Sequence, residues 1–584
     1  MHDLSYYLIS SPLAAIYTLL LGVSMLVVFD TAGLRLFNQY APWIRAMYFF
    51  SGLLVTANII LLLGACSLVT TTLLQLMAAC IITCAAIIVY RKKLISKLNS
   101  ALPVLNGTGW PGYLVLICLV AQLFIALAPP TDADSLDYHL GIPVEMLNSH
   151  SAWLNKDNLH FRMFGFGEML NLLGLANGCA QFGAFIQYIS LLWLLVVCIS
   201  IVDKERKPQV AAMVLSVPVF LFLIATQKHQ LTGVACTSIC FIGVYKYKDE
   251  IRGKILALFI AVLLFAAGIK YSFLLSMAVL IFSFMYSTKR PMAAIAWLTV
   301  LGLIFLGPMY LVKYINYNDP LSPLLEKYTS HPDIAVTRLS SSLKRFRESS
   351  LPFPLGLLIP KSAGYISTIL GTGLLLIIAV AAFARKQTVA VFTICLFIVL
   401  TILFSQTTSR FFIEPYVWAV IVIFTAPAIP ALIQPISVLC RLQFVLLVPL
   451  FVLMALLLGR GIISNKAREH VMSDYSTGYA ESRWMDTVLP DDAIVCTDIR
   501  SRSLLPRPYF PVEYLKLIVQ NPQRLDEMIY NKYKVNYLVA GDKMLPALHE
   551  RYAGELIAEK TFYKATRNPF NKKAFTLKIY STGK

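Results

Sequence analysis

The sequence is poor in charged residues. Only 14% of its 584 residues are Asp, Glu, Lys or Arg, whereas 58% are hydrophobic. Soluble globular chains carry about 25% charged residues, so this composition argues against an ordinary soluble protein. The apolar residues gather in long runs, and a helix needs about 20 such residues to cross a bilayer. We therefore predict an α-helical, polytopic membrane protein.

Cysteine pairs and targeting signals are also missing. The eleven cysteines lie almost entirely in apolar runs, no CxxC motif occurs, and only Cys496 falls in a clearly polar stretch. Neither a disulfide framework nor a zinc site is predicted. The first residues, MHDLSYYLIS, lack a basic start and a small-residue cleavage site, so we expect the first span to act as the insertion signal. No internal repeat or low-complexity tract is present.

The apolar runs predict about 14 membrane spans, each near the length that crosses a bilayer. The region 255–287 fits either two short spans that meet at GIKYS or one long tilted helix. The predicted spans cover residues 11–29, 46–65, 69–90, 112–128, 180–202, 209–226, 231–245, 255–269, 273–287, 292–313, 364–384, 388–404, 412–433 and 442–459.

The formal net charge of +19 is explained by the membrane topology. Many of the Lys and Arg residues lie in short loops between spans, which favours the positive-inside rule over a nucleic-acid partner. Under the predicted topology the segments 129–179, 314–363 and 460–584 and both termini face the exterior. The loops assigned to the cytoplasm are 91–97, 203–207, 246–254, 288–290 and 385–386.

The tail from residue 460 onward contains no span. The stretches AIVCTD, VNYLVAG and FTLKIYS are rich in β-branched and aromatic residues, which is typical of strands, whereas YAESRWMDTVL and PQRLDEMIYNKYK have helical spacing. We predict an external α/β domain over 460–584, without a glycine-rich phosphate loop. The rest divides into extra N-terminal helices (1–111) and a main transmembrane domain (112–459).

Ionisable groups gather where one predicted span ends. The stretch PPTDADSLDYHLGIP, residues 129–143, contains Asp132, Asp134, Asp137 and His139. An ionisable group beside a membrane helix is costly, so it is a candidate for function. The structural alternative is a solvated loop in which Asp134 or Ser135 caps a helix.

Further charged residues fall on the same predicted side. A carboxylate set with several separated cations suits a substrate that has both a phosphate and hydroxyl groups, and the fork of arginine binds two phosphate oxygens at once. Taken alone, Lys228 or Lys270 is also explained by snorkelling to the membrane interface. The set consists of Glu168, Lys228, His229, Lys270, Arg410, Glu414 and the basic run Lys344, Arg345 and Arg347.

The order of several short motifs resembles the GT-C superfamily. These are integral-membrane glycosyltransferases, and the resemblance is to bacterial members related to protein O-mannosyltransferases and lipid A aminoarabinose transferases. It covers roughly 112–425 and departs from the family pattern in one respect. The acidic loop usually follows the first span, whereas here three additional spans precede the span 112–128 that leads into it. The motifs are DSLDYHLGIP, GEMLNLLGL, GIKYS, NYNDPLSPLL and SRFFIEP.

The resemblance implies a GT-C fold and a donor sugar carried on a polyprenyl phosphate. It places a general base on Asp134, with Asp132 as the second choice, and an inverting attack by an acceptor hydroxyl or amine. The protein would sit in the bacterial inner membrane with its site facing the periplasm. The donor phosphate is assigned first to Arg410, then to Lys270, Arg345 and Arg347. Acceptor-orienting roles fall to His139, Glu168, Lys228 and His229.

No cofactor is required under this interpretation, because side chains alone can neutralise a lipid monophosphate. Glu168 and His139 are the residues to which a divalent metal would bind. The sugar, hexosyl or pentosyl, and the acceptor, a lipid, glycan or protein, stay open. Two alternatives also stay open: a ligase or polymerase of polyprenyl-linked glycans, and a lipid or glycan transporter. A transporter usually shows internal repeats, which are absent.

Overall fold

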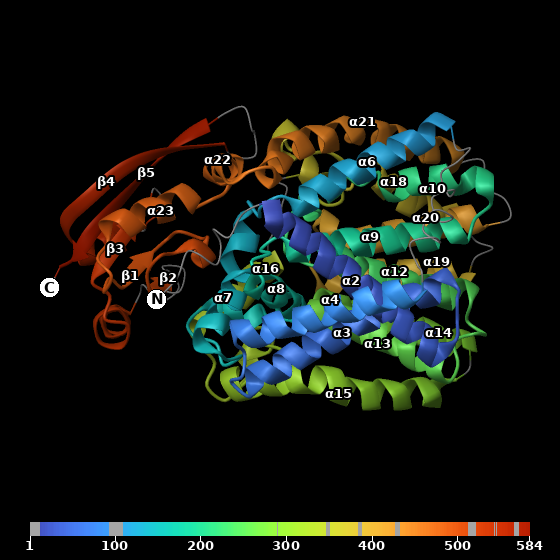
Figure 1. Cartoon of the computed structure of the whole chain (residues 1–584), viewed down its shortest axis with the longest axis horizontal. Coiled ribbons are helices and arrows are strands. Elements are labelled where there is room, and N and C mark those ends of the chain that lie inside the picture. The colour runs from blue at the N-terminus through green and yellow to red at the C-terminus, as the bar shows by residue number, and fades with distance from the viewer. Residues whose placement is uncertain are drawn as a thin grey trace.

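The computed structural model describes residues 12–92, 109–288, 290–345, 351–383, 388–426, 433–511, 515, 521–541, 544, 546–565 and 572–583. Apolar helices form a bundle, and a smaller unit of helices and one sheet lies at one end of it (Figure 1). We call this smaller part, residues 460–583, the C-terminal unit. The predicted fold class, a helical membrane protein with a C-terminal α/β region, is confirmed.

The helices of the bundle follow the predicted spans closely. Seven helices of the described residues are long and apolar enough to cross a membrane, and six further apolar helices are shorter, so the predicted number of spans is not established. The main helices are α2 (Pro12–Phe37), α3 (Pro42–Ala65), α4 (Thr71–Lys92), α6 (Gly109–Leu127), α9 (Phe182–Ser200), α10 (Lys207–Val214), α11 (Phe220–Leu223), α12 (Gln230–Lys246), α13 (Lys254–Ile269), α14 (Ser272–Thr288), α15 (Pro291–Tyr317), α18 (Gly373–Phe383), α19 (Thr388–Phe404), α20 (Ile413–Thr425) and α21 (Gln434–Gly459).

Several predicted spans contain breaks. The predicted span 364–384 is divided into the 3₁₀ helix Ala363–Thr368 and helix α18, with extended backbone at Ile369 between them. The region 255–287 forms two helices, α13 and α14, and the backbone is extended at Lys270 between them. The region therefore forms two short helices that meet at GIKYS, and not one long tilted helix. The predicted span 209–226 is not one helix, because α10 ends at Val214 and α11 has a single turn. Pro218 lies in the interruption, where it cannot donate a backbone hydrogen bond.

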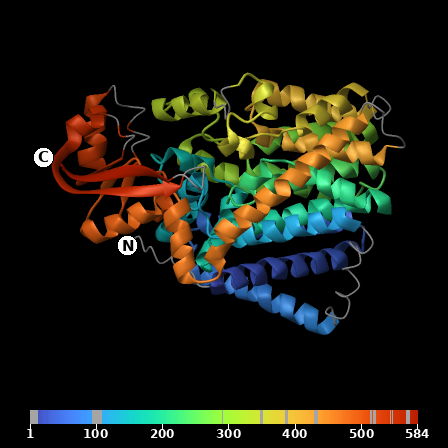
Figure 2. The same cartoon turned by 90° about the horizontal axis from the view of Figure 1, so that it is seen from above.

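The three N-terminal helices pack as part of the bundle. Helix α3 contacts α8 (Phe166–Ala176) and α13, and α2 contacts α9. Figure 2 shows these blue helices along one side of the bundle. The end of α3 also holds the segment that follows the acidic loop, because the Ala152 amide donates to the Gly64 carbonyl and the Trp153 indole donates to the Ala65 carbonyl. These helices therefore brace the loop that carries the candidate site.

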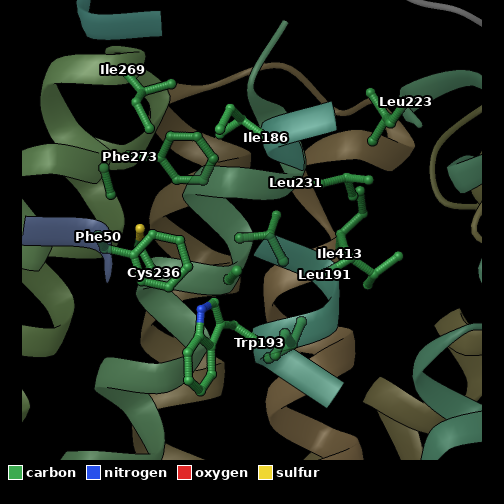
Figure 3. Packing of buried hydrophobic residues seen from close by; sticks show 14 of the residues in the cluster. Phe50, Ile186, Leu191, Trp193, Leu223, Leu231, Cys236, Ile269, Phe273 and Ile413 are labelled. Atoms are coloured by element: carbon green, nitrogen blue, oxygen red, sulfur yellow. The ribbon is translucent and has the colours of Figure 1, made fainter. Parts of the chain in front are cut away.

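The centre of the bundle is filled by aromatic and branched side chains from α9, α12, α14 and α20. Figure 3 shows Trp193, Cys236, Phe273 and Ile413 within this core. A Cβ atom on Gly233 would meet the Phe273 ring closer than 3.0 Å, so glycine permits α12 and α14 to approach. Because lipid tails are as apolar as these side chains, close packing holds such helices together.

Short helices connect the bundle on the side of the C-terminal unit. They include a π-helix, η2 (Ser135–His139), and the 3₁₀ helices η3 (Leu159–Met163), η5 (Glu326–Tyr328), η6 (Ala363–Thr368) and η7 (Ser409–Phe411). The α-helices there are α7 (Gly141–Ser149), α8, α16 (Ile334–Arg345) and α17 (Leu355–Leu358). Helices α7 and α16 lie at the end of the bundle next to the C-terminal unit (Figure 1).

The C-terminal unit contains a five-stranded sheet in the order β2-β1-β3-β5-β4. Strands β2, β1 and β3 are parallel, whereas β3, β5 and β4 are antiparallel. The predicted strands at AIVCTD, VNYLVAG and FTLKIYS form β1, β3 and β5, and β2 and β4 were not predicted. The elements are α22 (Asn465–Tyr475), α23 (Tyr479–Val488), β1 (Val495–Thr497), η10 (Arg502–Leu504), β2 (Tyr509–Pro511), α25 (Pro522–Asp526), η11 (Glu527–Lys532), β3 (Tyr537–Ala540), α26 (Pro546–Tyr552), β4 (Ala553–Ala565) and β5 (Lys572–Thr582).

We expect the C-terminal unit to be a folded region that limited proteolysis cuts at its connection to the bundle without digesting it. Ile463 and Ser464, between α21 and α22, are exposed, and an exposed connection is where proteases cut first. Brief digestion of the purified protein, followed by mass spectrometry, should yield a stable fragment that begins near Ser464. Digestion of this region to short peptides at the same rate as the connection is cut would contradict the prediction.

Candidate active site

The acidic loop folds into a π-turn that is capped by Asp132. The Leu140 amide donates to the Ser135 carbonyl, 2.9 Å away, and the Asp132 carboxylate accepts from the Ser135 amide at 2.9 Å. The expected capping role of Asp134 is wrong, because its side chain makes no capping bond. Burial raises the pKa of Asp132, although Lys228 opposes the shift. Single π-turns occur often at functional sites.

Asp134 projects from the start of this turn and is held between two cations. Its Oδ2 lies 2.5 Å from Lys228 Nζ, and its Oδ1 lies 2.6 Å from Arg500 Nη2. The Asp134 side chain is 29% exposed, that of Lys228 only 2% and that of Arg500 46%. Burial acts to raise the pKa of Asp134, but Lys228 and Arg500 outweigh it and hold that pKa well below its usual range. The carboxylate is therefore ionised at neutral pH.

Lys228 is fixed by a buried polar network centred on Asn171. The Asn171 amide donates to the carbonyls of His139, at 3.1 Å, and of Gln227, at 3.0 Å. The side-chain oxygen of Asn171 lies 2.9 Å from His229 Nε2, and the backbone amide of Gln227 donates to Ser135 Oγ at 2.7 Å. The network joins the π-turn, helix α8 and the turn 226–230, so the predicted residues Lys228 and His229 are brought to the acidic loop.

Glu168 orients His139. Glu168 lies in the first turn of α8, where its Oε2 accepts from the Gly165 amide at 2.7 Å. Its Oε1 is 2.6 Å from His139 Nδ1, and both side chains are buried. A hydrogen bond at one imidazole nitrogen sets the orientation of the ring and determines which nitrogen carries the proton. In the described part of the chain His139 Nε2 is buried without a hydrogen-bond partner.

Two further cations lie close to this group. Lys270 Nζ donates to Gln230 Oε1 at 3.2 Å, and Arg410 donates to Gln406 Oε1 at 2.8 Å. Among the described residues neither cation has a carboxylate within 4 Å. Burial, and then repulsion from Arg410 and Lys228, lower the pKa of Lys270 well below its usual range. Neighbouring cations that repel one another favour a bound anion.

A second carboxylate, Asp137, anchors the C-terminal unit. It is fully buried and lies 3.3 Å from Arg502 Nε and 3.0 Å from His160 Nδ1. Burial raises the pKa of Asp137, but Arg502 and His160 lower it further, so the net shift is downward. Ser503 also donates to the Leu136 carbonyl. Three residues of the C-terminal unit, Arg500, Arg502 and Ser503, therefore reach the acidic loop.

Not every predicted residue falls in the part of the chain that the structure describes. Arg347 lies outside the described residues, as do the side chains of Lys344 and Arg345 at the end of α16. Glu414 is buried at the start of α20, one turn after Arg410. In the described ranges, no three His, Cys, Asp or Glu side chains gather in an arrangement that could hold a metal ion.

Sequence reasoning missed Arg500, Arg502, Asn171 and Gln227. The two arginines stand in the stretch DIRSRS, directly after the predicted strand AIVCTD. Residues at the carboxyl end of a parallel strand frequently form sites, so this position was a usable signal. Asn171 and Gln227 carry no comparable signal, because an uncharged amide in an apolar helix or turn is not distinctive.

The Asn171 network leaves no room for a side chain at Gly183, where α9 begins. A Cβ there would come within 3.0 Å of Asn171 Oδ1, Gln227 Oε1 and His229 Nε2. Gly183→Ala should destabilise the protein by about 1–3 kcal/mol, the usual cost of overpacking. Thermal unfolding in detergent measures this effect. Gly302→Ala is the matched control: nothing lies within 4 Å of its Cβ, and its melting temperature should be unchanged or higher. Equal melting temperatures for Gly183→Ala and wild type would contradict the packing.

Comparison with solved structures finds proteins that resemble this chain. The structure of ArnT from Cupriavidus metallidurans bound to undecaprenyl phosphate has a similar fold, with a TM-score of 0.50, 15% identity, and coverage of 81% of this chain and 98% of that one. Its apo state gives a TM-score of 0.46 at the same identity and coverage. AglB from Archaeoglobus fulgidus, in complex with an inhibitory peptide and a dolichol-phosphate, gives 0.40 at 11% identity, covering 77% of this chain and 73% of that one.

The resemblance to the GT-C superfamily is confirmed at the level of the fold. No curated protein matches the chain in sequence. The family model described as the DUF1420 N-terminal domain matches residues 112–472. This match contains the bundle from α6 to α21, the acidic loop, and every predicted site residue. The chain therefore belongs to the DUF1420 N-terminal domain family.

Proposed function

We propose that this protein is a glycosyltransferase. It moves a hexosyl or pentosyl group from a polyprenyl-phosphate donor to an acceptor hydroxyl or amine, with inversion at the anomeric carbon. The observation that carries the proposal is an ionised carboxylate, Asp134, within electrostatic range of Lys270, which in turn interacts with Arg410. Among the described residues these two side chains have no carboxylate partner. This arrangement offers a proton acceptor and an anion site in one cluster.

Lys270 and Arg410 are the proposed site of the donor phosphate. When the bond between the sugar and the phosphate breaks, its electron pair passes to the phosphate oxygen. Cations fixed near that oxygen stabilise the transition state more than the ground state. The buried Phe411 ring, 5.3 Å from the Arg410 guanidinium, packs against this side chain and helps to fix its position. The ArnT structure with a similar fold contains undecaprenyl phosphate, which supports a lipid donor.

Asp134 is the proposed general base. The acceptor oxygen or nitrogen bonds to the anomeric carbon while its proton passes to Asp134, on the face opposite the departing phosphate. A carboxylate held between cations is a weak base, so the role requires that one of them withdraws. Asp132 remains the second choice, because its Oδ2 is buried without a hydrogen-bond partner within the described ranges. His139, oriented by Glu168, and His229 lie close enough to position the acceptor.

The site is proposed to face the periplasm of a bacterial inner membrane. The three segments that the topology places outside contact one another: Arg162 pairs with Glu326 at 3.1 Å, Arg524 with Asp333 at 3.2 Å, and Arg502 with Asp137. Segments that touch lie on the same side of the membrane, and basic loops mark the other side as cytoplasmic. We also propose the division into 1–111, a transmembrane domain 112–459 and an external domain 460–584.

Turnover of the purified protein tests the function. The protein would be mixed with polyprenyl-phosphate-linked sugars, one at a time, and release of the lipid phosphate would be followed. Asp134→Asn should lower turnover by a factor of about 100 or more, the usual scale for loss of a general base. The change also leaves the buried Lys228 without its anion, which costs stability. The double variant Asp134→Asn/Lys228→Gln removes that cost and should stay inactive.

Asp132→Asn completes this comparison. Loss of activity in Asp132→Asn with normal turnover in Asp134→Asn would move the base to Asp132. Wild-type rates in both variants would leave the proposal without a catalytic centre.

Removal of Arg410 should impair the chemical step. Arg410→Ala should lower kcat by a factor of about 100, the scale for loss of one donor to a developing oxyanion. Arg410→Lys should recover only part, because an ammonium cannot bind two oxygens in the same plane. Arg441→Ala, a half-buried arginine on α21, serves as the control and should keep wild-type turnover. A fully active Arg410→Ala would move the phosphate site elsewhere.

A further inference from the structure

Arg500 holds a position on Asp134 that a substrate group needs. A general base must lie about 2.6–3.2 Å from the atom whose proton it accepts. Both oxygens of Asp134 already have a partner at this range, because Lys228 lies 2.5 Å from Oδ2 and Arg500 lies 2.6 Å from Oδ1. An acceptor hydroxyl or amine that donates a proton to Asp134 therefore competes with one of the two cations.

Lys228 is the cation that stays. Its ammonium is buried and lies 4.4 Å from the centre of the Phe222 ring. Lys228 itself belongs to the turn 226–230, which the Asn171 network fixes. Moving it would place a charge among apolar groups without its anion, which is strongly unfavourable. The Lys228 contact with Oδ2 thus belongs to the framework of the site.

Arg500 is the cation that can leave. Its side chain is about half exposed, so water replaces Asp134 and Asp137, which lies 3.6 Å away, when Arg500 turns outward. Asp137 keeps Arg502 and His160 as partners. The backbone nearby need not move, because Arg502 and Ser503 are buried and hold the same stretch to Asp137 and Leu136. Arg502 also donates to Asn158 at 2.5 Å. One stretch of the C-terminal unit thus contains a buried anchor, Arg502, and two residues before it a half-exposed cation, Arg500.

We propose that the acceptor binds between the C-terminal unit and the acidic loop, with its nucleophilic group in the place that the Arg500 guanidinium holds on Asp134 Oδ1. This inference rests on the proposed function and extends it by locating the acceptor site. Departure of Arg500 leaves the base with one cation, so its affinity for a proton rises as the acceptor arrives. Until then Arg500 keeps water from the base, which limits wasteful hydrolysis of the donor.

Hydrolysis of the donor in the absence of any acceptor tests the inference. Water is then the nucleophile, and release of lipid phosphate from a polyprenyl-phosphate sugar is measured. Arg500→Gln should raise this rate by about two- to fivefold, the amount by which one exposed ion pair shifts an equilibrium. Arg500→Lys should lie between Arg500→Gln and wild type. Arg507→Gln is the matched control, because Arg507 pairs with Asp486 and Asp491 inside the C-terminal unit, and its rate should equal that of wild type.

A rate in Arg500→Gln at or below that of wild type would overturn the inference. Hydrogen exchange of the amides in residues 132–140 provides a second readout that needs no chemistry. Arg500→Gln should exchange faster there than Arg507→Gln, because the side chain that covers Asp134 is gone, and equal exchange would also overturn it. If neither wild type nor any variant releases lipid phosphate, the proposed function fails, and the exchange data still decide whether Arg500 covers Asp134.

Discussion

The side-chain amide of Asn171 holds the candidate site together. It donates to two backbone carbonyls from different segments and accepts from a third group, His229, and all of these atoms are buried. A buried carbonyl without a hydrogen-bond partner costs more free energy of folding than a typical hydrogen bond contributes. Loss of any one of these contacts is therefore strongly unfavourable. The π-turn, helix α8 and the turn 226–230 consequently have one relative placement. The positions of Asp134 and Lys228 follow from it, because each lies next to a residue that this network fixes.

The surrounding charges are arranged by how deeply each is buried. Lys228, Asp137 and Arg502 are buried, and each has an opposite charge within 3.5 Å, as a low dielectric requires. Arg500 and Asp134 are partly exposed, where water supports a charge whose partner departs. Lys270 and Arg410 have amide partners only, as far as the described residues show. A buried framework of ion pairs, a half-exposed arginine and two further basic side chains thus occur together where the bundle meets the C-terminal unit.

Sequence patterns predicted the parts of the structure that depend on local information. The long apolar helices of the bundle, strands β1, β3 and β5, and the gathering of Asp134, His139, Glu168 and Lys228 follow from hydrophobic runs, residue types and the family motifs, whereas the break within 209–226 does not. The contact between Arg500 and Asp134 joins residues 366 positions apart, and no local period reports such a pair. The capping of the π-turn by Asp132 was missed for a related reason. A turn with one extra residue shifts every side chain after it, and its sequence resembles that of an ordinary helix start.

The core of the C-terminal unit includes side chains from earlier in the chain. Leu159 of η3, together with Ala335 and Val336 of α16, packs against Phe510, Leu525 and Leu538. The ribosome completes α16 long before these C-terminal residues exist, so its apolar face stays uncovered until the end of the chain is made. Formation of the bundle therefore begins before the core of the C-terminal unit can close. A chain that stops after the last membrane helix leaves that face uncovered, which makes it a substrate for quality-control proteases.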